Sequence, residues 1–306
     1  MRNAFAEELT NLAKENESIF LLSGDIGNKL FDKYKENDAS RFLNCGVAEQ
    51  NMMSMSAGMA SVGMKPIVYT ITSFLTARCW EQIKVDIGYN KLPVIIVGVG
   101  GGLSYAELGP THHSCEDIGL LKLIPNMTIL CPGDAYEVRA LLRAALKHDG
   151  PIFMRIGKKG EPLVHQSIPE ITIGKSLVVK EGNEVCLLSV GNMLPSVMKA
   201  AEILNAKGIS TQVVSVHTVK PLDRESLQKY FSEFKIVATV EEHNIIGGLG
   251  SSIAEWLINT PSSKAKLICM GLPDLFHESL HQESAREKYN LTPESIAERI
   301  INFGNN

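Results

Sequence analysis

The sequence predicts an α/β protein of two domains, each with a mostly parallel sheet that carries helices on both faces. Short β-branched runs alternate with helical patterns through the first 160 residues, and the same alternation resumes after about residue 183. Alternating strands and helices favour parallel sheets, because each crossover helix covers a face of the sheet. The length of 306 residues also suffices for two domains with separate cores.

The first domain is expected to span residues 1–160. Phe5, Leu9 and Leu12 form a helical stripe near its start. Asp134 is a suitable N-cap for a helix over residues 135–146, and Gly150-Pro151 ends that unit. Buried strands are expected at residues 19–22, 67–69, 94–99, 128–130 and 152–154.

The periodicity lapses between about residues 157 and 182, where Lys, Gly, Glu and Pro cluster. We therefore expect a linker at residues 161–182 and a second domain at residues 183–306. The strands expected in the second domain lie at residues 185–190, 211–216, 235–240 and 266–270, and its helices at residues 194–207, 223–231, 249–258 and 292–301.

The composition is typical of a water-soluble globular protein, with 44% hydrophobic and 21% charged residues. A net charge of −4 gives no basic excess for nucleic acid binding. No apolar stretch reaches membrane-spanning length, and the N-terminus lacks the apolar segment of a signal peptide. The six cysteines are widely spaced, which favours reduced thiols and a cytoplasmic location.

Glu49 is the first candidate functional residue. It is the only charged residue between Arg41 and Lys65, and it precedes a run of small and apolar residues at 52–62. Such a helix is buried on most sides, so a carboxylate in its first turn needs specific partners or a raised pKa. The alternative interpretation is a carboxylate that only complements the helix dipole. An isolated acid in an apolar helix nevertheless indicates a functional site.

The segment around Glu49, Phe42-Leu43-Asn44-Cys45-Gly46-Val47-Ala48-Glu49-Gln50-Asn51, resembles the F-N-V-G-I-A-E-Q signature of transketolases and deoxyxylulose-phosphate synthases. The resemblance extends through most of the first 160 residues, and the later part keeps the C-terminal layout of that family. Several ordered motifs carry it: Ser73-Phe74-Leu75-Thr76-Ala77-Arg78, Gly109-Pro110-Thr111-His112, Ile124-Pro125-Asn126-Met127 and Pro132-Gly133-Asp134.

The resemblance implies that the chain binds the pyrimidine end of thiamine diphosphate. In that family the carboxylate at the Glu49 position hydrogen-bonds the aminopyrimidine ring and favours the tautomer that activates the cofactor. Phe74 matches the aromatic residue that stacks on this ring, although by itself it is typical of a core residue. Ile71 stands where the family often has a second aromatic residue and would form an apolar wall. Arg78 would lie in the same cleft, or would pair with Glu81 or Asp86.

The substrate residues are also implied by the resemblance. His112 takes the position of a histidine that binds substrate hydroxyls or moves protons, and the role of the neighbouring His113 is open. Leu108 and Gly100 replace an aspartate and a histidine that are usual in transketolases. A leucine cannot accept a hydrogen bond from a sugar hydroxyl, so we expect a donor substrate that is altered near this position.

A substrate phosphate is expected to bind arginines, whose planar fork forms paired hydrogen bonds with phosphate. Arg155 and Arg2 match basic positions of the family, and Lys29 is a further candidate. Arg155 would lie at a strand end, where ligands bind in open α/β folds. Arg2 is equally consistent with a solvated side chain near the terminus.

Three other motifs predict no separate activity. The glycine-rich run at residues 98–103 has Leu103 at the third glycine position of a dinucleotide fingerprint, so we expect a loop whose backbone approaches a ligand instead. The run at residues 112–116 lacks the ligand spacing of a zinc site. The glycines at 247–250 begin a helix and are expected to serve packing or dimerisation.

The chain lacks the Gly-Asp-Gly motif, followed by Asn, with which this family binds the diphosphate and Mg²⁺. We therefore expect a C-terminal half of a split transketolase. A separate N-terminal subunit would carry the diphosphate and Mg²⁺, and an α2β2 heterotetramer would transfer a ketol unit between sugar phosphates or modified sugars. The alternatives are the β subunit of a 2-oxo-acid dehydrogenase E1 component and a non-catalytic scaffold subunit.

Overall fold

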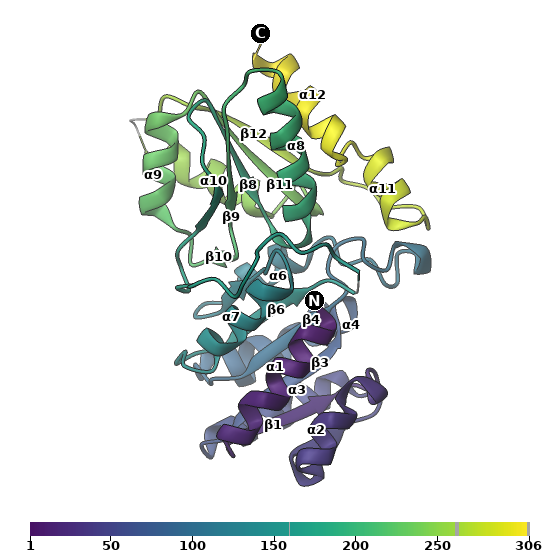
Figure 1. Ribbon diagram of the computed structural model, residues 1–306. Helices are drawn as coiled ribbons and strands as arrows, with labels where there is room; N and C mark the ends of the chain where they lie inside the picture. The colour runs from purple at the N-terminus through teal and green to yellow at the C-terminus, as the bar shows by residue number, and fades with distance from the viewer. Residues whose placement is uncertain (159, 261–262, 305–306) are drawn as a thin grey trace.

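The computed structural model describes residues 1–158, 160–260 and 263–304, which form two sheets, one above the other in Figure 1. The lower sheet has seven strands in the order β10-β5-β6-β4-β3-β1-β2. All neighbouring pairs are parallel except β10 with β5. Its strands are β1 (Ile19–Ser23), β2 (Phe42–Asn44), β3 (Lys65–Ile71), β4 (Ile95–Val99), β5 (Thr128–Leu130), β6 (Ile152–Ile156) and β10 (Thr218–Lys220).

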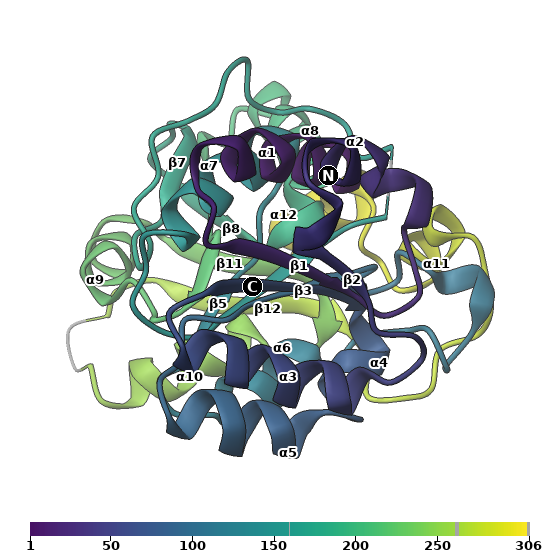
Figure 2. The same cartoon turned by 90° about the horizontal axis from the view of Figure 1, so that it is seen from below.

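Helices cover both faces of the lower sheet, as Figure 2 shows. One face carries α1 (Arg2–Glu15), α2 (Asp32–Asn37) and α7 (Ala135–Ala145). The other face carries α3 (Glu49–Ser61), α4 (Thr72–Thr76), α5 (Trp80–Gln82), the π-helix η3 (Ile83–Tyr89) and α6 (Asp117–Lys122). Short 3-10 turns are η1 (Asn28–Phe31), η2 (Ala39–Arg41), η4 (Ala106–Leu108) and η5 (Gly191–Met193).

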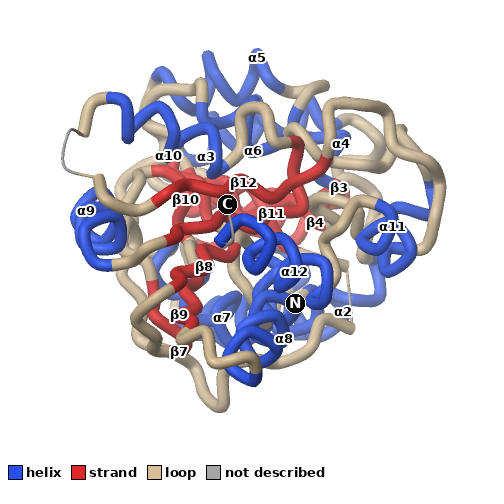
Figure 3. The backbone as a smooth tube through the Cα atoms, turned by 90° about the horizontal axis from the view of Figure 1, so that it is seen from above, coloured by secondary structure: helices blue, strands red, loops and turns tan. Residues whose placement is uncertain are grey.

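The upper sheet has five strands in the order β12-β11-β8-β9-β7, and only β7 is antiparallel to its neighbour. The helices α8 and α12 lie on one side of it and α9 and α10 on the other (Figure 3). The predicted fold class is therefore confirmed. The elements are β7 (Leu177–Lys180), β8 (Val185–Ser189), α8 (Leu194–Ala206), β9 (Thr211–Ser215), α9 (Arg224–Glu233), β11 (Ile236–Asn244), α10 (Leu249–Ile258), β12 (Lys266–Leu272), α11 (Gln282–Lys288) and α12 (Pro293–Gly304).

The structure differs from the sequence prediction where two edge strands cross the expected domain boundaries. The predicted linker at residues 161–182 ends in β7, which is an edge strand of the upper sheet. The strand β10 lies beyond the linker in sequence but pairs with β5 of the lower sheet. Both strands are short, and β7 is only partly buried. Neither therefore has the long apolar run from which a strand is recognised in sequence.

The two domains share one continuous core. A single cluster of buried side chains joins Leu22 and Met52 of the first domain to Val190 and Phe231 of the second. The relative position of the domains is therefore fixed by packing. In the part of the chain that the structure describes, no helix has the length and apolar character needed to cross a bilayer.

The linker is anchored to the N-terminus of α7. Asp134 caps this helix, as predicted, by accepting hydrogen bonds from the amides of Tyr136 and Glu137. Its second oxygen accepts the amides of Val164 and His165 in the linker. The His165 ring lies 2.9 Å from the buried carboxylate of Glu137. The linker is therefore held by charged groups as well as by packing.

The contact between His165 and Glu137 predicts a pH-dependent contribution to stability. Burial lowers the pKa of His165, but the hydrogen bond and charge of Glu137 outweigh it and raise the pKa above its ordinary value. A raised folded-state pKa stabilises the protein below the unfolded pKa, and this contribution is lost as pH rises through the folded value. Urea unfolding should show that His165→Gln destabilises the chain more at about pH 6 than at about pH 9. An equal loss at both values would contradict the ion pair.

Candidate active site

The candidate site lies at the carboxyl ends of the parallel strands β1, β3 and β4. The strand β2 lies on one side of β1, and the chain then crosses to β3 on the other side. In open α/β sheets, ligands bind outside the carboxyl ends of strands at such a reversal of strand order. The helix α3 connects β2 to β3, so its first turn lies at this edge.

Glu49 is the first residue of α3, and only 2% of it is exposed. Its Oε2 accepts a hydrogen bond of 2.8 Å from Nη1 of Arg78. Within the described residues, the other oxygen, Oε1, accepts no hydrogen bond. The structure thus contains a buried carboxylate with one oxygen held and one available for a donor.

Phe74 and Arg78 continue the site from Glu49. The Arg78 guanidinium lies 5.0 Å from the centroid of the Phe74 ring, so Arg78 contacts both Glu49 and Phe74. Asp86 was one of the two alternative ion-pair partners expected for Arg78. It accepts a hydrogen bond from Ser54. Phe74 is half-buried and is therefore not a fully enclosed core residue. Ile71 is also half-buried and packs against the core on the α1 side of the sheet.

His112 lies against the other side of Phe74, with ring centroids 5.1 Å apart in an edge-to-face arrangement. Its Nδ1 is 2.9 Å from the hydroxyl of Thr111. Burial, and secondarily the neighbouring His113, lower the pKa of His112 below its ordinary value. The imidazole is therefore neutral near pH 7 and can accept or donate a proton. The structure brings together Glu49, Arg78, Phe74 and His112, as expected from the sequence.

Tyr105 extends the site beyond His112 and was not recognised from the sequence. The Tyr105 ring centroid is 6.2 Å from the His112 ring centroid. Nζ of Lys158 lies 4.9 Å from the Tyr105 ring centroid. Burial raises the pKa of Tyr105, and the nearby positive charge of Arg2 opposes this effect. Arg2 and Lys29 both line a surface hollow beside α1 and α2. Arg2, Lys158 and, farther out, Lys29 are therefore cations at this end of the site.

Arg155 is not available to a phosphate where the structure places it, contrary to the prediction. It is 4% exposed, and its Nε donates to Asp117 Oδ2 at 2.7 Å. Its Nη2 donates to the main-chain carbonyls of Ser114 and Glu242, the latter in the second domain. A guanidinium with these partners is a structural group between the domains. The prediction relied on the position of Arg155 near the end of a strand. It failed because the side chain turns into the interior rather than towards the edge of the sheet.

The glycines at 100–102 lie against protein side chains. Gly100 has φ +86°, and a Cβ there would overlap the ring of Tyr105. A Cβ on Gly101 would lie 2.6 Å from the Arg155 side chain, and one on Gly102 would lie 2.5 Å from Glu242. These glycines admit protein side chains, so close approach of the backbone to a ligand is not needed to explain them. The same contact explains why a histidine is not accommodated at Gly100 while Tyr105 occupies this space.

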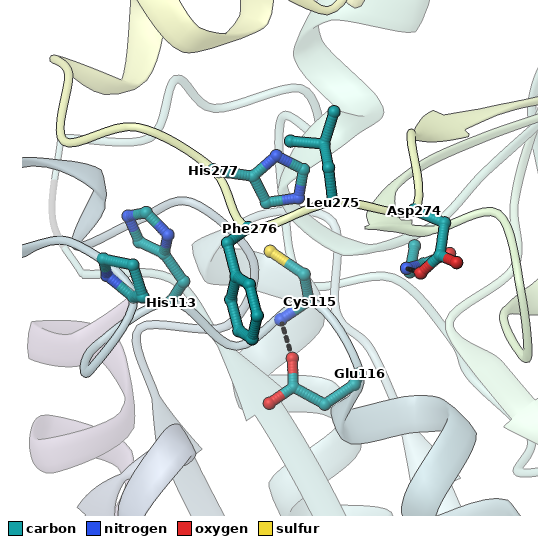
Figure 4. Close-up of a pocket in the computed structure, with 9 residues that line it drawn as sticks. His113, Cys115, Glu116, Asp274, Leu275, Phe276 and His277 are labelled. Carbon is teal, nitrogen blue, oxygen red and sulfur yellow. Dashed lines mark hydrogen bonds between the residues drawn. The ribbon is translucent and has the colours of Figure 1, made fainter.

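Leu108 and His113 face different surroundings. Leu108 is 53% exposed on the turn η4. His113 is buried, and its Nε2 is 3.0 Å from the carbonyl of Ala106. It lines a second hollow of about 400 Å³ between the domains. Figure 4 shows this hollow, whose other lining residues are Pro110, Cys115, Glu116, Asn244, Asp274, Leu275, Phe276 and His277.

The N-terminus of α10 is already occupied by the protein itself. The carboxylate of Glu241 accepts the amides of Leu249 and Gly250 at 2.8 and 2.9 Å. These donors are therefore not available to an external anion. Among the residues that the structure describes, no group of three or more Asp, Glu, His or Cys side chains could hold a metal ion.

Comparison with known proteins identifies both domains. Residues 1–161 match the model of the transketolase pyrimidine-binding domain, and residues 174–296 match that of the transketolase C-terminal domain. A putative transketolase C-terminal section of Methanocaldococcus jannaschii is 34% identical over 98% of this chain and 95% of its own length. One subunit of an apulose-4-phosphate transketolase from Phocaeicola vulgatus is 32% identical over 99% of this chain and 96% of its own length.

Two further proteins support the same assignment. A 6-deoxy-6-sulfo-D-fructose transketolase subunit of a Clostridium species is 33% identical over 97% of this chain and 92% of its own length. The solved structure of a split-gene transketolase, described as an inactive β4 tetramer, superimposes with a TM-score of 0.87 at 35% identity over 97% of this chain and 95% of that one. The chain therefore belongs to the transketolase family, and it corresponds to the C-terminal subunit of a split transketolase-like enzyme.

Proposed function

We propose that the chain is the pyrimidine-binding subunit of a two-component, thiamine diphosphate-dependent transketolase. The observation that carries this proposal is the buried Glu49 carboxylate, which accepts a hydrogen bond from Arg78 through Oε2, while the same guanidinium contacts the half-buried ring of Phe74. A ring N–H can donate to this carboxylate while the ring stacks on Phe74. Thiamine diphosphate supplies a carbanion equivalent for ketol transfer when bound.

Arg78 adapts the pocket to a planar ring. Its guanidinium now contacts the face of Phe74 and donates to Glu49. Its side chain is 45% exposed and so can shift towards solvent, provided that the ring N–H replaces it as a donor to the buried Glu49 carboxylate. Whether the Arg78 guanidinium keeps its hydrogen bond to Glu49 Oε2 then depends on where the pyrimidine ring of the cofactor binds. Glu49 would accept the hydrogen bond of the ring nitrogen. The role expected for Ile71 as an apolar wall is not supported by its packing, which is with the core on the α1 side of the sheet.

His112 handles protons on the substrate side. Its neutral imidazole lies between Phe74 and Tyr105, and Thr111 fixes its Nδ1. It can therefore exchange a proton with a substrate hydroxyl through Nε2. A substrate phosphate would bind Arg2 and Lys158, which flank Tyr105, with Lys29 contributing from the same side. Lys158 takes the role that the sequence had suggested for Arg155.

A separate subunit is proposed to hold the diphosphate and Mg²⁺. Apolar side chains are exposed at both ends of α3 and on the neighbouring η3: Val47 at 77%, Val62 at 76%, Val85 at 49% and Tyr89 at 82%. Exposed apolar side chains on neighbouring elements favour a protein interface there. The relative described as an inactive β4 tetramer also supports a need for a second subunit. We propose an α2β2 assembly and a cytoplasmic location.

Leu108 provides a test of the donor substrate. Relatives of this chain are named for apulose-4-phosphate and for 6-deoxy-6-sulfo-D-fructose, which supports a donor other than an ordinary ketose phosphate. The change Leu108→Asp adds a strong acceptor on the exposed turn η4. We expect kcat/KM to shift by about tenfold towards donors that carry a hydroxyl at the facing position.

The matched control for this change is Leu123→Asp, which adds the same charge at an exposed leucine outside the site. Competition assays with pairs of ketose phosphates would measure the preference. An unchanged preference in Leu108→Asp, with the same turnover as Leu123→Asp, would place Leu108 outside the donor pocket.

Cofactor binding separates the proposal from a scaffold subunit. Isothermal titration with thiamine diphosphate and Mg²⁺ should show tight binding only when this chain and its partner are combined. A mixture that binds no cofactor would support a scaffold. A stable complex with a lipoyl-domain protein, together with turnover of a 2-oxo acid, would support the β subunit of an E1 component.

A further inference from the structure

The loop at residues 100–114 carries Tyr105, Leu108 and His112, and we call it the site loop. It leaves the end of β4 and returns to its own base, where Gly102 and Ser114 exchange two main-chain hydrogen bonds of 2.8 and 3.0 Å. The amides of Gly100 and Gly101 donate to the carbonyl of Ile156 in β6. Ser73 and His281 also contact the loop, at the Thr111 carbonyl and at Glu107, but the base fixes where both of its ends begin.

The base of the site loop is held by Glu242, which comes from the second domain. Oε2 of Glu242 accepts the amide of Leu103 at 3.0 Å, although the two residues are 139 positions apart in sequence. The position of a Cβ on Gly102 is filled by the same carboxylate and by the main-chain carbonyl of Glu242. That carbonyl also accepts from Arg155, which donates in turn to Ser114 on the other side of the base. Glu242 thus contacts one side of the loop closure directly and is linked to the other side through Arg155.

The Glu242 carboxylate is itself fixed by three side chains. Arg286 donates to Oε1 at 2.6 Å, Gln282 donates to both oxygens, and Asn192 donates to Oε2 at 3.1 Å. Burial by itself would raise the pKa of Glu242, but Arg286 and these hydrogen bonds hold the pKa below its ordinary value. We call Glu242, Asn192, Gln282 and Arg286 the Glu242 clasp. The ionised carboxylate is the acceptor that all three donors share.

The neighbouring residue offers a natural contrast. Glu241 is also buried on β11, but its carboxylate points to α10 and accepts the amides of Leu249 and Gly250. Burial raises the pKa of Glu241 above its ordinary value. Glu241 therefore stabilises the second domain without a hydrogen bond to the site loop. The two acids lie on the same strand and are similarly buried. Glu242 accepts a hydrogen bond from the site loop, whereas Glu241 accepts hydrogen bonds from α10.

From these contacts we infer that Glu242 is a positioning residue, through which the second domain sets the place of His112 in the active site. The expected effect on catalysis rests on the proposed function. The hydrogen bonds of the Glu242 clasp do not depend on it. Glu49 and Phe74 lie on α3 and α4, outside the site loop. A loosened loop should therefore impair proton transfer by His112 while cofactor binding is retained.

The test compares Glu242→Gln with Glu241→Gln in the full-length chain. A glutamine at 242 has one NH₂ group in place of a carboxylate oxygen. This group must face either the donors of Leu103 and Asn192 or the donor of Arg286, so at least one hydrogen bond to a donor is lost. Hydrogen–deuterium exchange of peptides covering residues 100–114 should become about tenfold faster in Glu242→Gln and remain unchanged in Glu241→Gln. Arg286→Met leaves Glu242 in place and serves as the second variant, since Arg286 is partly exposed. It should change the exchange in the same direction.

Activity of the complex with the partner subunit provides the second readout. For Glu242→Gln we expect kcat to fall about tenfold with the dissociation constant of thiamine diphosphate unchanged, and for Glu241→Gln we expect neither to change. Unaltered exchange in both clasp variants, equal loosening in Glu241→Gln, or a full kcat with a loosened loop would each overturn the inference. A wild-type complex without turnover would instead count against the proposed function, and the exchange data would still decide whether the clasp holds the loop.

Discussion

Glu49→Gln is expected to lower kcat of the assembled enzyme by roughly 10²–10⁴-fold, the range typical of losing a general acid or base. Glutamine has nearly the same shape and can still accept from Arg78. Its amide cannot replace the negative charge that favours a protonated ring nitrogen. Thiamine diphosphate should still bind, because Phe74 and the partner subunit keep their contacts. Steady-state kinetics and cofactor titration on the same preparation would measure both effects.

Glu8→Gln is the matched control for this change. Glu8 is also a buried acid paired with arginines, here Arg139 and Arg143, but it joins α1 to α7 on the other face of the sheet. We expect a small loss of stability and unchanged kcat. Normal turnover in Glu49→Gln, or an equal loss of turnover in both variants, would contradict a specific role for the Glu49 carboxylate.

Arg155→Met is expected to lower the free energy of unfolding by about 3–5 kcal/mol, because it leaves the buried carboxylate of Asp117 without its cation. It also removes donors to Ser114 and Glu242 at the junction of the domains. Urea unfolding would report on both domains, since Trp80 lies in the first and Trp256 in the second.

A second substitution tests the physical reason. Adding Asp117→Asn to Arg155→Met removes the unpaired charge and should restore part of the loss. Arg139→Met should lose less than about 1 kcal/mol, because its pair with Glu7 is partly exposed and the buried Glu8 keeps Arg143 as its cation. Normal stability of Arg155→Met, combined with a selective loss of affinity for phosphorylated substrates, would restore the original prediction that Arg155 binds phosphate.

The long elements could be predicted from the sequence because their patterns are strong. The strand β5 at residues 128–130 and the helix α10 at residues 249–258 have the predicted bounds, and the Asp134 cap forms as expected. The short strands β2, β7 and β10 were missed, because each is recognised only through its partner in a sheet. Tertiary pairing, rather than local sequence, determines such strands.

The site divides in the same way. Glu49 could be found because an isolated charge in an apolar helix is visible in the sequence. The structure pairs it with Arg78, which contacts Phe74, and His112 packs against Phe74 in turn. Arg155 could not be assigned, because its partners Asp117 and Glu242 are 38 and 87 residues away. Tyr105 and Lys158 carry no local signal. The positive φ of Gly100 and its contact with the Tyr105 ring, which together explain that glycine, appear only in the structure. Long-range contacts therefore set the roles that sequence spacing alone left open.

The most direct test is a donor panel with the chain co-purified with its diphosphate-domain partner, in the presence of thiamine diphosphate and Mg²⁺. Ketose phosphates, a deoxyketose phosphate and pyruvate would be followed by mass spectrometry, with the Glu49→Gln complex in parallel. We expect transfer of a ketol unit from a ketose or modified sugar, at least about a hundredfold slower in Glu49→Gln and absent without the partner. Turnover of pyruvate alone, or turnover that does not need Glu49, would contradict assignment of the chain as the pyrimidine-binding subunit of a transketolase.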